Sequence, residues 1–507
     1  MKVTRKSTPR PAFTCLILFV AATCCALQAS AQESKIIVRL PANPSGHIVV
    51  EGDCAPARSY SFRDSYADVL GLGSRVSAFT LMNSAGERLE ARAIAPGQYE
   101  ASGPATRFRY ELNVAPPNSG NDAVKVSWLT TDRGVLMLAD LLPMNVLESR
   151  QASTEIQFVL PSGLMVYSNE KELQPLSFEV ANMDAAIFAV GRQLRASQAE
   201  VSGMSLSLVA DGAWAFTDND AIELAGQILK AHREIFGAMP SKHATILLLP
   251  YQTVIADRWR AETRGNTVTI LLGKIPSKVG ALAQLSTPLT HELFHLWVPN
   301  ALSLAGNYDW FYEGFTVYEA ARVAVSLNLL TFPEFLNAIS RAYDAYAASA
   351  DRDRRSLIES SAQRWTLGQT AVYQKSMVVA FICDLRIRSQ SHGKRSLDNL
   401  YRAIFRQYAN GVQRPTANSS LVANSEANAA VLQVMNSFAE LLDFGSSYVE
   451  QPIAIDLSTE LTRFGFKVER FGLRTRISVQ EQLTKAQRDL LHQLGYNDYV
   501  RRSPSKH

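Results

Sequence analysis

Cysteine is scarce in this chain of 507 residues, which contains only five. Three of the five lie before residue 31, so Cys54 and Cys383 are the two that remain beyond it. Two cysteines so far apart form no disulfide framework, which excludes the class of small proteins held together by disulfides. We expect two separate thiols, with Cys383 packed as a small hydrophobic residue because it follows the apolar run 377–382.

The sequence also lacks an excess of charge and long apolar runs. The formal net charge is +4, and four basic residues lie within the first ten, so the rest of the chain is close to neutral. This balance gives no indication of nucleic acid or an anionic surface as a partner, and we expect neither. Beyond residue 31 no stretch reaches the roughly 18 apolar residues that a membrane-spanning helix needs.

The N-terminal residues follow the order of a secretory signal peptide. Basic residues come first, an apolar run over 12–27 follows, and Ala29-Ser30-Ala31 ends the segment. This order predicts a signal peptide over residues 1–31 with cleavage after Ala31. The apolar run is short for a membrane span and its cysteines follow no convincing lipoprotein motif, so we predict no membrane anchor after cleavage. We expect an exported, soluble protein in the periplasm or the medium.

Histidine is rare as well, at eight of 507 residues, yet His291 and His295 lie four apart in the sequence HELFH. On a helix this spacing places both imidazoles on one face, where they can reach one metal ion. Glu292 is close enough to act on a metal-bound water, and Glu313 offers a third ligand. Three protein ligands and one open position form the coordination of a catalytic zinc. A chance His-Glu-x-x-His in this composition has a probability of only about one percent.

Each of these residues also has a less specialised interpretation. His291 and His295 could lie on a buried helix and satisfy only their neighbours. Glu313 could be a solvated helix residue, but its aromatic neighbours indicate that it is enclosed, and an enclosed carboxylate needs a partner. Glu319 could support a metal ligand from behind, but we favour a solvated carboxylate. The aromatic neighbours of Glu313 are Trp310, Phe311, Tyr312, Phe315 and Tyr318.

Local signals also predict the limits of the metal-binding helix. Ser286-Thr287-Pro288 offers an N-cap and a first-turn proline, and Pro299 ends the helix. Its apolar face is predicted to consist of Leu289, Leu293, Phe294 and Trp297.

The sequence HELFHLW followed by DWFYEGFTVYEA resembles the gluzincin metallopeptidases, and most closely the M61 glycyl aminopeptidase family. The resemblance implies a zinc ion as cofactor. It implies His291, His295 and Glu313 as the zinc ligands. It implies Glu292 as the general base.

Two further segments carry the same resemblance. Residues 372–376 are similar to a Tyr-x-Lys-Gly segment of the family, with Ser376 in place of the glycine, and imply that Tyr373 stabilises the tetrahedral intermediate. Residues 259–266 resemble a Gly-Gly-x-Glu-His-Arg-Asn segment, and imply that Glu262 binds the free amino terminus of a substrate. Bulkier residues replace the glycines here and a threonine replaces the histidine, so a solvated hairpin glutamate is the alternative interpretation.

Length and composition predict about three domains of α+β structure after cleavage. Residues 32–195 are predicted to form an N-terminal antiparallel β-sandwich, because short alternating strands are separated by turn clusters. Residues 196–345 place strands before the metal-binding helix, an order that resembles the thermolysin-like catalytic domain. Residues 346–507 are predicted to form a C-terminal helical domain. Strands are expected at 36–40, 108–114, 124–128, 205–209, 245–249 and 267–272.

Helices are expected where a capping residue precedes an apolar period. Asp218 or Asn219 caps a helix that ends near residue 236, and Ser396 caps a helix over 397–408. Further helices are expected at 373–388, 436–442 and 458–464, with a polar connection over 413–428.

These observations together predict an exported zinc metallopeptidase that cleaves peptide substrates with a zinc-bound water. Glu292 would be the base and Tyr373 the oxyanion donor, and the resemblance through Glu262 favours an aminopeptidase. Two alternatives remain: a zinc endopeptidase without amino-terminal selectivity, and a non-catalytic exported binding protein on a peptidase fold. The intact Glu292 argues against the second, because a structural metal site needs no base. The sequence does not determine the oligomeric state.

Overall fold

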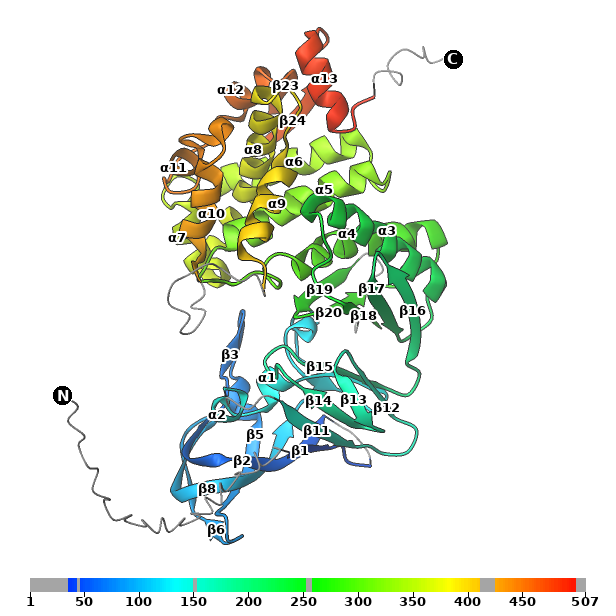
Figure 1. Ribbon diagram of the computed structural model, residues 1–507, viewed down its shortest axis with the longest axis vertical. Coiled ribbons are helices and arrows are strands. Elements are labelled where there is room, and N and C mark those ends of the chain that lie inside the picture. The colour runs from blue at the N-terminus through cyan, green and yellow to red at the C-terminus, as the bar shows by residue number, and fades with distance from the viewer. Residues whose placement is uncertain (1–34, 43–45, 149–152, 252–257, 411–424, 498–507) are drawn as a thin grey trace, which may run out of the picture. The chain divides into compact units, whose positions relative to one another are not determined.

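The computed structural model describes residues 35–42, 46–148, 153–251, 258–410 and 425–497 (Figure 1). The signal peptide predicted over residues 1–31 and the first twelve residues of the polar connection predicted over 413–428 lie outside these ranges. Within them, no helix has both the length and the apolar character needed to cross a membrane.

The N-terminal part contains two sheets that share one apolar core. In β1, Ile36 and Val38 are fully buried, and they pack with Leu136 and Phe188 from the smaller sheet. The larger sheet has the order β13-β14-β11-β1-β2-β8-β5-β6, with β7 paired to β8, and the smaller has the order β12-β15-β10-β9. The strands of the larger sheet are β1 (Lys35–Arg39), β2 (His47–Ser61), β5 (Val76–Met82), β6 (Arg88–Leu89), β7 (Ala91–Ala95), β8 (Gln98–Asn113), β11 (Thr154–Val159), β13 (Lys171–Gln174) and β14 (Ser177–Val180). Those of the smaller sheet are β9 (Trp128–Leu129), β10 (Arg133–Met137), β12 (Met165–Ser168) and β15 (Ile187–Gly191).

Two details of this part differ from the prediction. The pair β1–β11 is parallel, so the larger sheet is not wholly antiparallel. The strand expected at 124–128 is instead a 3-10 turn, Asp122–Val124, followed by β9. The Trp128 indole donates a hydrogen bond back to the Ala123 carbonyl over 2.7 Å, which holds the chain in a turn rather than an extended strand.

The middle part contains a five-stranded sheet with the order β16-β17-β18-β20-β19. The predicted strands 205–209, 245–249 and 267–272 fall within β17, β18 and β20, which run parallel to one another. The strand β19 is antiparallel to β20 and forms one edge of the sheet. The bounds are β16 (Arg195–Val201), β17 (Met204–Ala210), β18 (His243–Pro250), β19 (Trp259–Arg264) and β20 (Thr267–Leu272).

The helix α3 (Asp218–Phe236) connects β17 to β18, and its cap is Thr217 rather than Asp218 or Asn219 as predicted. The Thr217 hydroxyl accepts a hydrogen bond from the Asp220 backbone over 3.1 Å, and the Asp220 carboxylate accepts one from the Thr217 backbone over 2.8 Å. This reciprocal capping box satisfies two backbone donors at once, which a cap at Asp218 would not do.

The helix predicted to bind a metal is α4, which spans Lys278–Glu292, so the predicted start at Pro288 is wrong. Ser277 caps the helix, and Pro288 lies inside it. A proline inside a helix costs about 3 kcal/mol. Fully burying Leu285 contributes about 1.5–3 kcal/mol, and with the burial of Ala281 in the same turns it offsets much of that cost. The predicted apolar face is confirmed, because Leu289, Leu293, Phe294 and Trp297 are all at most 1% exposed.

The remaining chain is mainly helical. Helices α5, α6 and α9 pack against α8, which is buried along most of its length and includes the free, buried thiol of Cys383 (Figure 1). The second free thiol, Cys54, is half-buried, so the prediction of separate thiols is confirmed. The bounds are α5 (Thr316–Ser326), α6 (Phe332–Ala348), α7 (Leu357–Ala362), α8 (Ser376–Gln390), α9 (Leu397–Tyr408), α10 (Ala427–Asn436), α11 (Phe444–Tyr448), α12 (Leu457–Thr462) and α13 (Lys485–Gln493).

The predicted helix bounds agree best with the structure where a capping residue directly precedes the helix. Ser396 caps α9, whose bounds match the predicted 397–408, and α12 lies near the predicted 458–464. The helix expected at 436–442 is only a 3-10 turn, Ala439–Leu441, because α10 already ends at Asn436. The hairpin β23 (Phe466–Phe471) and β24 (Arg474–Val479) was not predicted, since charged residues interrupt its apolar pattern. The structure is therefore mixed α+β, and the three domain boundaries stay a prediction.

Candidate metal centre

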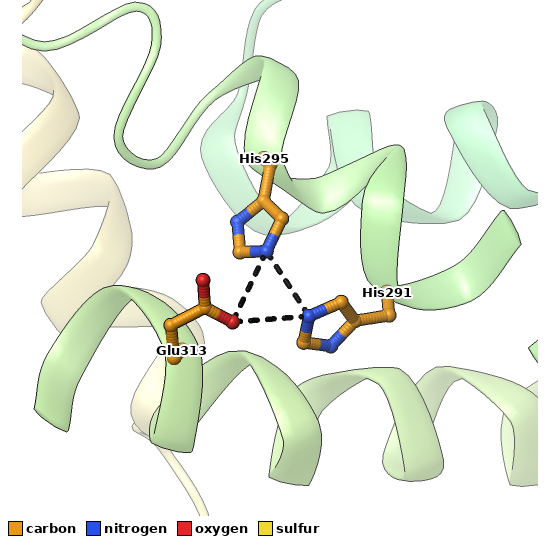
Figure 2. A group of neighbouring side chains, drawn as sticks. All are labelled: His291, His295 and Glu313. Atoms are coloured by element: carbon orange, nitrogen blue, oxygen red, sulfur yellow. Dashed lines mark hydrogen bonds and ion pairs between the residues drawn. The ribbon is translucent and has the colours of Figure 1, made fainter. Parts of the chain in front are cut away.

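The three predicted metal ligands converge in the folded chain (Figure 2). His291 lies in the last turn of α4, His295 in the 3-10 turn that follows it, and Glu313 in the π-helical turn Trp310–Phe315 that leads into α5. The two imidazole Nε2 atoms are 3.1 Å apart. Oε2 of Glu313 is 3.3 Å from Nε2 of His291 and 3.5 Å from Nε2 of His295. Within the described residues, no other group of three such side chains could share an ion.

These separations fit a zinc ion. Zinc binds nitrogen and oxygen ligands at about 2.0–2.2 Å in a tetrahedron, which places the ligand atoms about 3.4 Å from one another. The observed spacings of 3.1, 3.3 and 3.5 Å bracket that value. The donor set of two histidines and one glutamate leaves one tetrahedral position for a non-protein ligand, which is the arrangement of a catalytic site.

Contacts behind the ligands set their orientation and charge. Nδ1 of His295 lies 2.9 Å from the Val298 carbonyl, which fixes the tautomer that turns the Nε2 lone pair toward the other ligands. Burial lowers the pKa of His295, but Glu313 outweighs it and raises that pKa to about 9. Burial raises the pKa of Glu313, but Arg364 and His295 outweigh it and hold that pKa well below its usual range. The negative charge that keeps a proton on His295 would also favour a metal cation, and zinc binding would displace that proton.

The Glu292 carboxylate is buried beside this triad. Its Oε2 accepts a hydrogen bond of 2.8 Å from the Thr263 hydroxyl, which also lies 2.9 Å from the Glu292 carbonyl. Burial raises the pKa of Glu292, and the two neighbouring histidines only partly oppose it. A carboxylate with a raised pKa and a fixed orientation can act as a general base. Thr263, noted in the sequence only as a replacement for histidine, therefore positions Glu292 from the edge strand β19.

Tyr373 reaches the centre because two backbone turns approach each other closely. It lies in the π-helical turn Ala371–Lys375 that precedes α8. A Cβ on Gly314 would lie 2.1 Å from the Ser376 Cβ and 2.3 Å from the Val372 carbonyl, so only glycine fits beside this turn. Ser376 occupies the position of the family's glycine, and the missing side chain at Gly314 makes room for it.

Arg364 joins Tyr373 to the metal ligands, and sequence reasoning missed it. Its Nη2 donates a hydrogen bond to the Tyr373 hydroxyl and lies 2.8 Å from Oε1 of Glu313. Arg364 belongs to the π-helical turn Arg364–Gly368, far from the ligand motifs in sequence. No spacing or motif marks a single arginine in this stretch, so nothing in the sequence could have indicated it.

Glu262 is neither a solvated hairpin residue nor part of the ligand triad. Its Oε1 accepts hydrogen bonds from the Tyr66 hydroxyl over 2.6 Å and from Arg264 Nε over 3.0 Å. Tyr66 comes from the short hairpin β3 (Ser65–Tyr66) and β4 (Val69–Leu70), and the Arg264 guanidinium lies 3.9 Å from the centre of its ring. Consecutive residues of a strand project to opposite faces, so the Glu262 side chain leaves β19 on the face opposite to that of Thr263.

The interpretation of Glu319 as a solvated carboxylate is wrong. Its side chain is fully buried on α5 and lies 2.7 Å from Arg322. Burial raises the pKa of Glu319 to about 8 despite this ion pair. Among the described residues, no hydrogen bond or ion pair connects Glu319 to the three ligands, so it supports the helix rather than the centre.

Comparisons with known proteins agree with this geometry. The family model described as M61 glycyl aminopeptidase matches residues 284–380, a span that includes the triad, Glu292 and Tyr373, so the predicted resemblance is confirmed. No protein among the curated sequences matches the chain.

Solved structures show the same fold at low sequence identity. An aminopeptidase N family protein from Idiomarina loihiensis is 16% identical with a TM-score of 0.73, over 86% of this chain and 79% of that one. An M1 zinc metallopeptidase from Deinococcus radiodurans, in a mutant form bound to a Tyr-Ser-Ala substrate, is 14% identical with a TM-score of 0.54, over 84% of this chain and 94% of that one. The mixed α+β fold is thus that of aminopeptidase-like metallopeptidases.

Proposed function

From the match of residues 284–380 to the M61 glycyl aminopeptidase family, we propose that this chain is a zinc metallopeptidase that hydrolyses peptides, with aminopeptidase selectivity. The signal-peptide pattern of residues 1–31 is the ground for proposing that it is exported. One observation carries the proposal. The three ligand atoms of His291, His295 and Glu313 converge at the spacing of a tetrahedral zinc site, beside the buried Glu292 carboxylate. The peptide bound to the M1 structure from Deinococcus radiodurans supports peptides as the substrate class.

The residues of the centre divide the work of peptide hydrolysis. Zinc held there would act as a Lewis acid toward the carbonyl and lower the pKa of a coordinated water. Glu292 would accept a proton from the attacking water and later pass it to the leaving amine, while Thr263 holds its Oε2 in place. Tyr373 would donate a hydrogen bond to the carbonyl oxygen, where negative charge develops in the transition state.

Amino-terminal selectivity depends on Glu262. Its Oε1 already accepts two hydrogen bonds, so the α-ammonium group of a substrate would bind its other oxygen. The Arg264 guanidinium beside it weakens the attraction for a second cation, and this ion pair favours the alternative of an endopeptidase without amino-terminal selectivity.

Zinc analysis tests the metal site, and a matched pair of peptides tests the selectivity for a free amino terminus. We expect about one zinc per chain, loss of the metal in Glu313→Ala, and retention in the control Glu319→Gln, whose buried carboxylate has no ligand role. A peptide with a free amino terminus should be cleaved faster than the same peptide with an acetylated one. Equal rates would support the endopeptidase, and a chain without zinc or hydrolysis would overturn the proposal.

A further inference from the structure

Arg364 lies between Glu313, a predicted metal ligand, and Tyr373, the proposed oxyanion donor. Both of its Nη atoms have partners, whereas its buried Nε has none among the described residues. Its Nη2 donates to Tyr373 and lies 2.8 Å from Oε1 of Glu313. Its Nη1 donates to Oδ1 of Asp309 over 2.9 Å and to the Tyr312 hydroxyl over 3.0 Å. The two Nη atoms therefore make three hydrogen bonds and one ion pair, and the side chain is only 11% exposed. Rotation of the guanidinium would break several of these contacts at once.

Because of the contact with Arg364, the two carboxylate oxygens of Glu313 have different partners. Oε2 faces the Nε2 atoms of both histidines, whereas Oε1 faces Arg364. A carboxylate held in this way offers one oxygen to a metal ion and keeps the other in an ion pair with Arg364. Partners behind a ligand typically affect metal affinity or activity about 10- to 100-fold, because they fix the ligand before the ion arrives.

The contact with Tyr373 sets the direction of its hydroxyl. A guanidinium only donates hydrogen bonds, so the Tyr373 oxygen is the acceptor and its proton remains available. Tyr312 also accepts from Arg364, but its own proton goes to Oδ1 of Asp309 over 2.7 Å. Among the residues that the structure describes, none accepts the proton of Tyr373. Of the two tyrosines on Arg364, only Tyr373 has a donor free for a substrate.

We propose that Arg364 is a positioning residue of this centre, an inference that rests on the proposed function. It holds Glu313 as a one-oxygen ligand and holds Tyr373 with its proton directed to the substrate carbonyl. The competing explanation is a structural ion pair in which any buried positive charge would serve Asp309 and Glu313. The two differ in what they require, because positioning needs the planar fork of arginine, whereas charge balance needs only a cation.

Arg364→Lys separates these explanations, because it keeps the charge and removes the fork. Zinc affinity would be measured by competition with a chelator, and kcat and KM on a peptide at saturating zinc. We expect zinc affinity to fall about tenfold and kcat to fall about 10- to 100-fold, with KM changed less than about threefold. Arg388→Lys is the matched control, since Arg388 is also buried and ion-paired, to Asp384, but touches no residue of the centre.

The same substitution in a Tyr373→Phe background tests the connection between the two residues. If Arg364 acts through the Tyr373 hydroxyl, Arg364→Lys should lower kcat by less than about threefold once that hydroxyl is gone. An equal loss in both backgrounds would overturn the connection to Tyr373, and unchanged zinc affinity and kcat would overturn the proposal altogether. A parent chain that binds no zinc would instead overturn the proposed function. The zinc measurement needs no peptide, so it tests whether Arg364 positions Glu313 independently of which substrate is cleaved.

Discussion

Among single residues, Glu292 distinguishes an enzyme from a binding protein on the same fold. Its buried carboxylate accepts a hydrogen bond from Thr263 and lies beside both histidines. Glu292→Gln keeps the shape and the acceptor but cannot take a proton, so zinc should be retained and kcat should fall by about 10²–10⁴-fold. Metal content and turnover on one preparation check this. Loss of zinc in the variant would make Glu292 a ligand or a support instead.

The two tyrosines bound to Arg364 give a second comparison at the residue scale. Tyr373→Phe removes a hydroxyl with an uncommitted proton, and loss of an oxyanion donor typically lowers kcat about 10²–10³-fold. Tyr312→Phe removes a hydroxyl whose proton is bound to Asp309, so its kcat should fall far less. Steady-state kinetics of both variants, with zinc content confirmed, measure the difference. Parental turnover in Tyr373→Phe would remove Tyr373 from the mechanism.

At the scale of secondary-structure elements, the close approach at Gly314 brings the Tyr373 turn to the Glu313 turn. A Cβ there would lie 2.1 Å from the Ser376 Cβ and 2.3 Å from the Val372 carbonyl, and neither atom is the end of a flexible side chain. Gly314→Ala should therefore separate the two turns, lower the free energy of unfolding by about 1–3 kcal/mol or more, and lower kcat.

The matched control for Gly314 is another helical glycine. A Cβ on Gly226 in α3 would lie 3.5 Å from a Val201 methyl group, an ordinary contact, so Gly226→Ala should raise helix stability by up to about 1 kcal/mol. Urea unfolding and turnover compare the two variants. Equal stabilisation by both substitutions would show that the turns beside Gly314 can move apart freely.

At the scale of the whole molecule, Lys375 is predicted to affect the pH dependence of folding stability. The residue is only 1% exposed, and among the described residues no carboxylate lies within ion-pair distance of its ammonium group. Burial lowers the pKa of Lys375 from its ordinary value of 10.5 to about 8. The unfolded chain therefore binds more protons than the folded chain between these values, and the contribution of this group to stability rises with pH across that window.

Lys375→Met should remove this pH dependence while filling the same space. The free energy of unfolding should rise most below pH 8, and the gain should shrink as the pH rises from 8 toward 10.5. Urea unfolding of parent and variant at pH 7 and pH 10 measures the two differences. A gain of the same size at both values would show that the lysine does not titrate abnormally in the folded protein.

The sequence by itself determined the features that depend on neighbours along the chain. The four-residue spacing of His291 and His295 predicted that both imidazoles lie on one face and come together, and their Nε2 atoms do so although His295 lies in a 3-10 turn rather than in α4. The aromatic residues around Glu313 predicted its burial, and Ser396 predicted the start of α9. Each of these signals operates within one or two helical turns, where periodicity and capping relate sequence directly to geometry.

Only the tertiary structure decided which distant groups complete the centre. Arg364 reaches Glu313, Thr263 reaches Glu292, and Tyr66 reaches Glu262 across separations for which local periodicity carries no information. The start of α4 was missed for a related reason, because packing of its earlier turns outweighs the local signal of Pro288. The predicted ligand residues could thus be named from the sequence, whereas the contacts that orient them arise from long-range packing, which brings together residues that no motif connects.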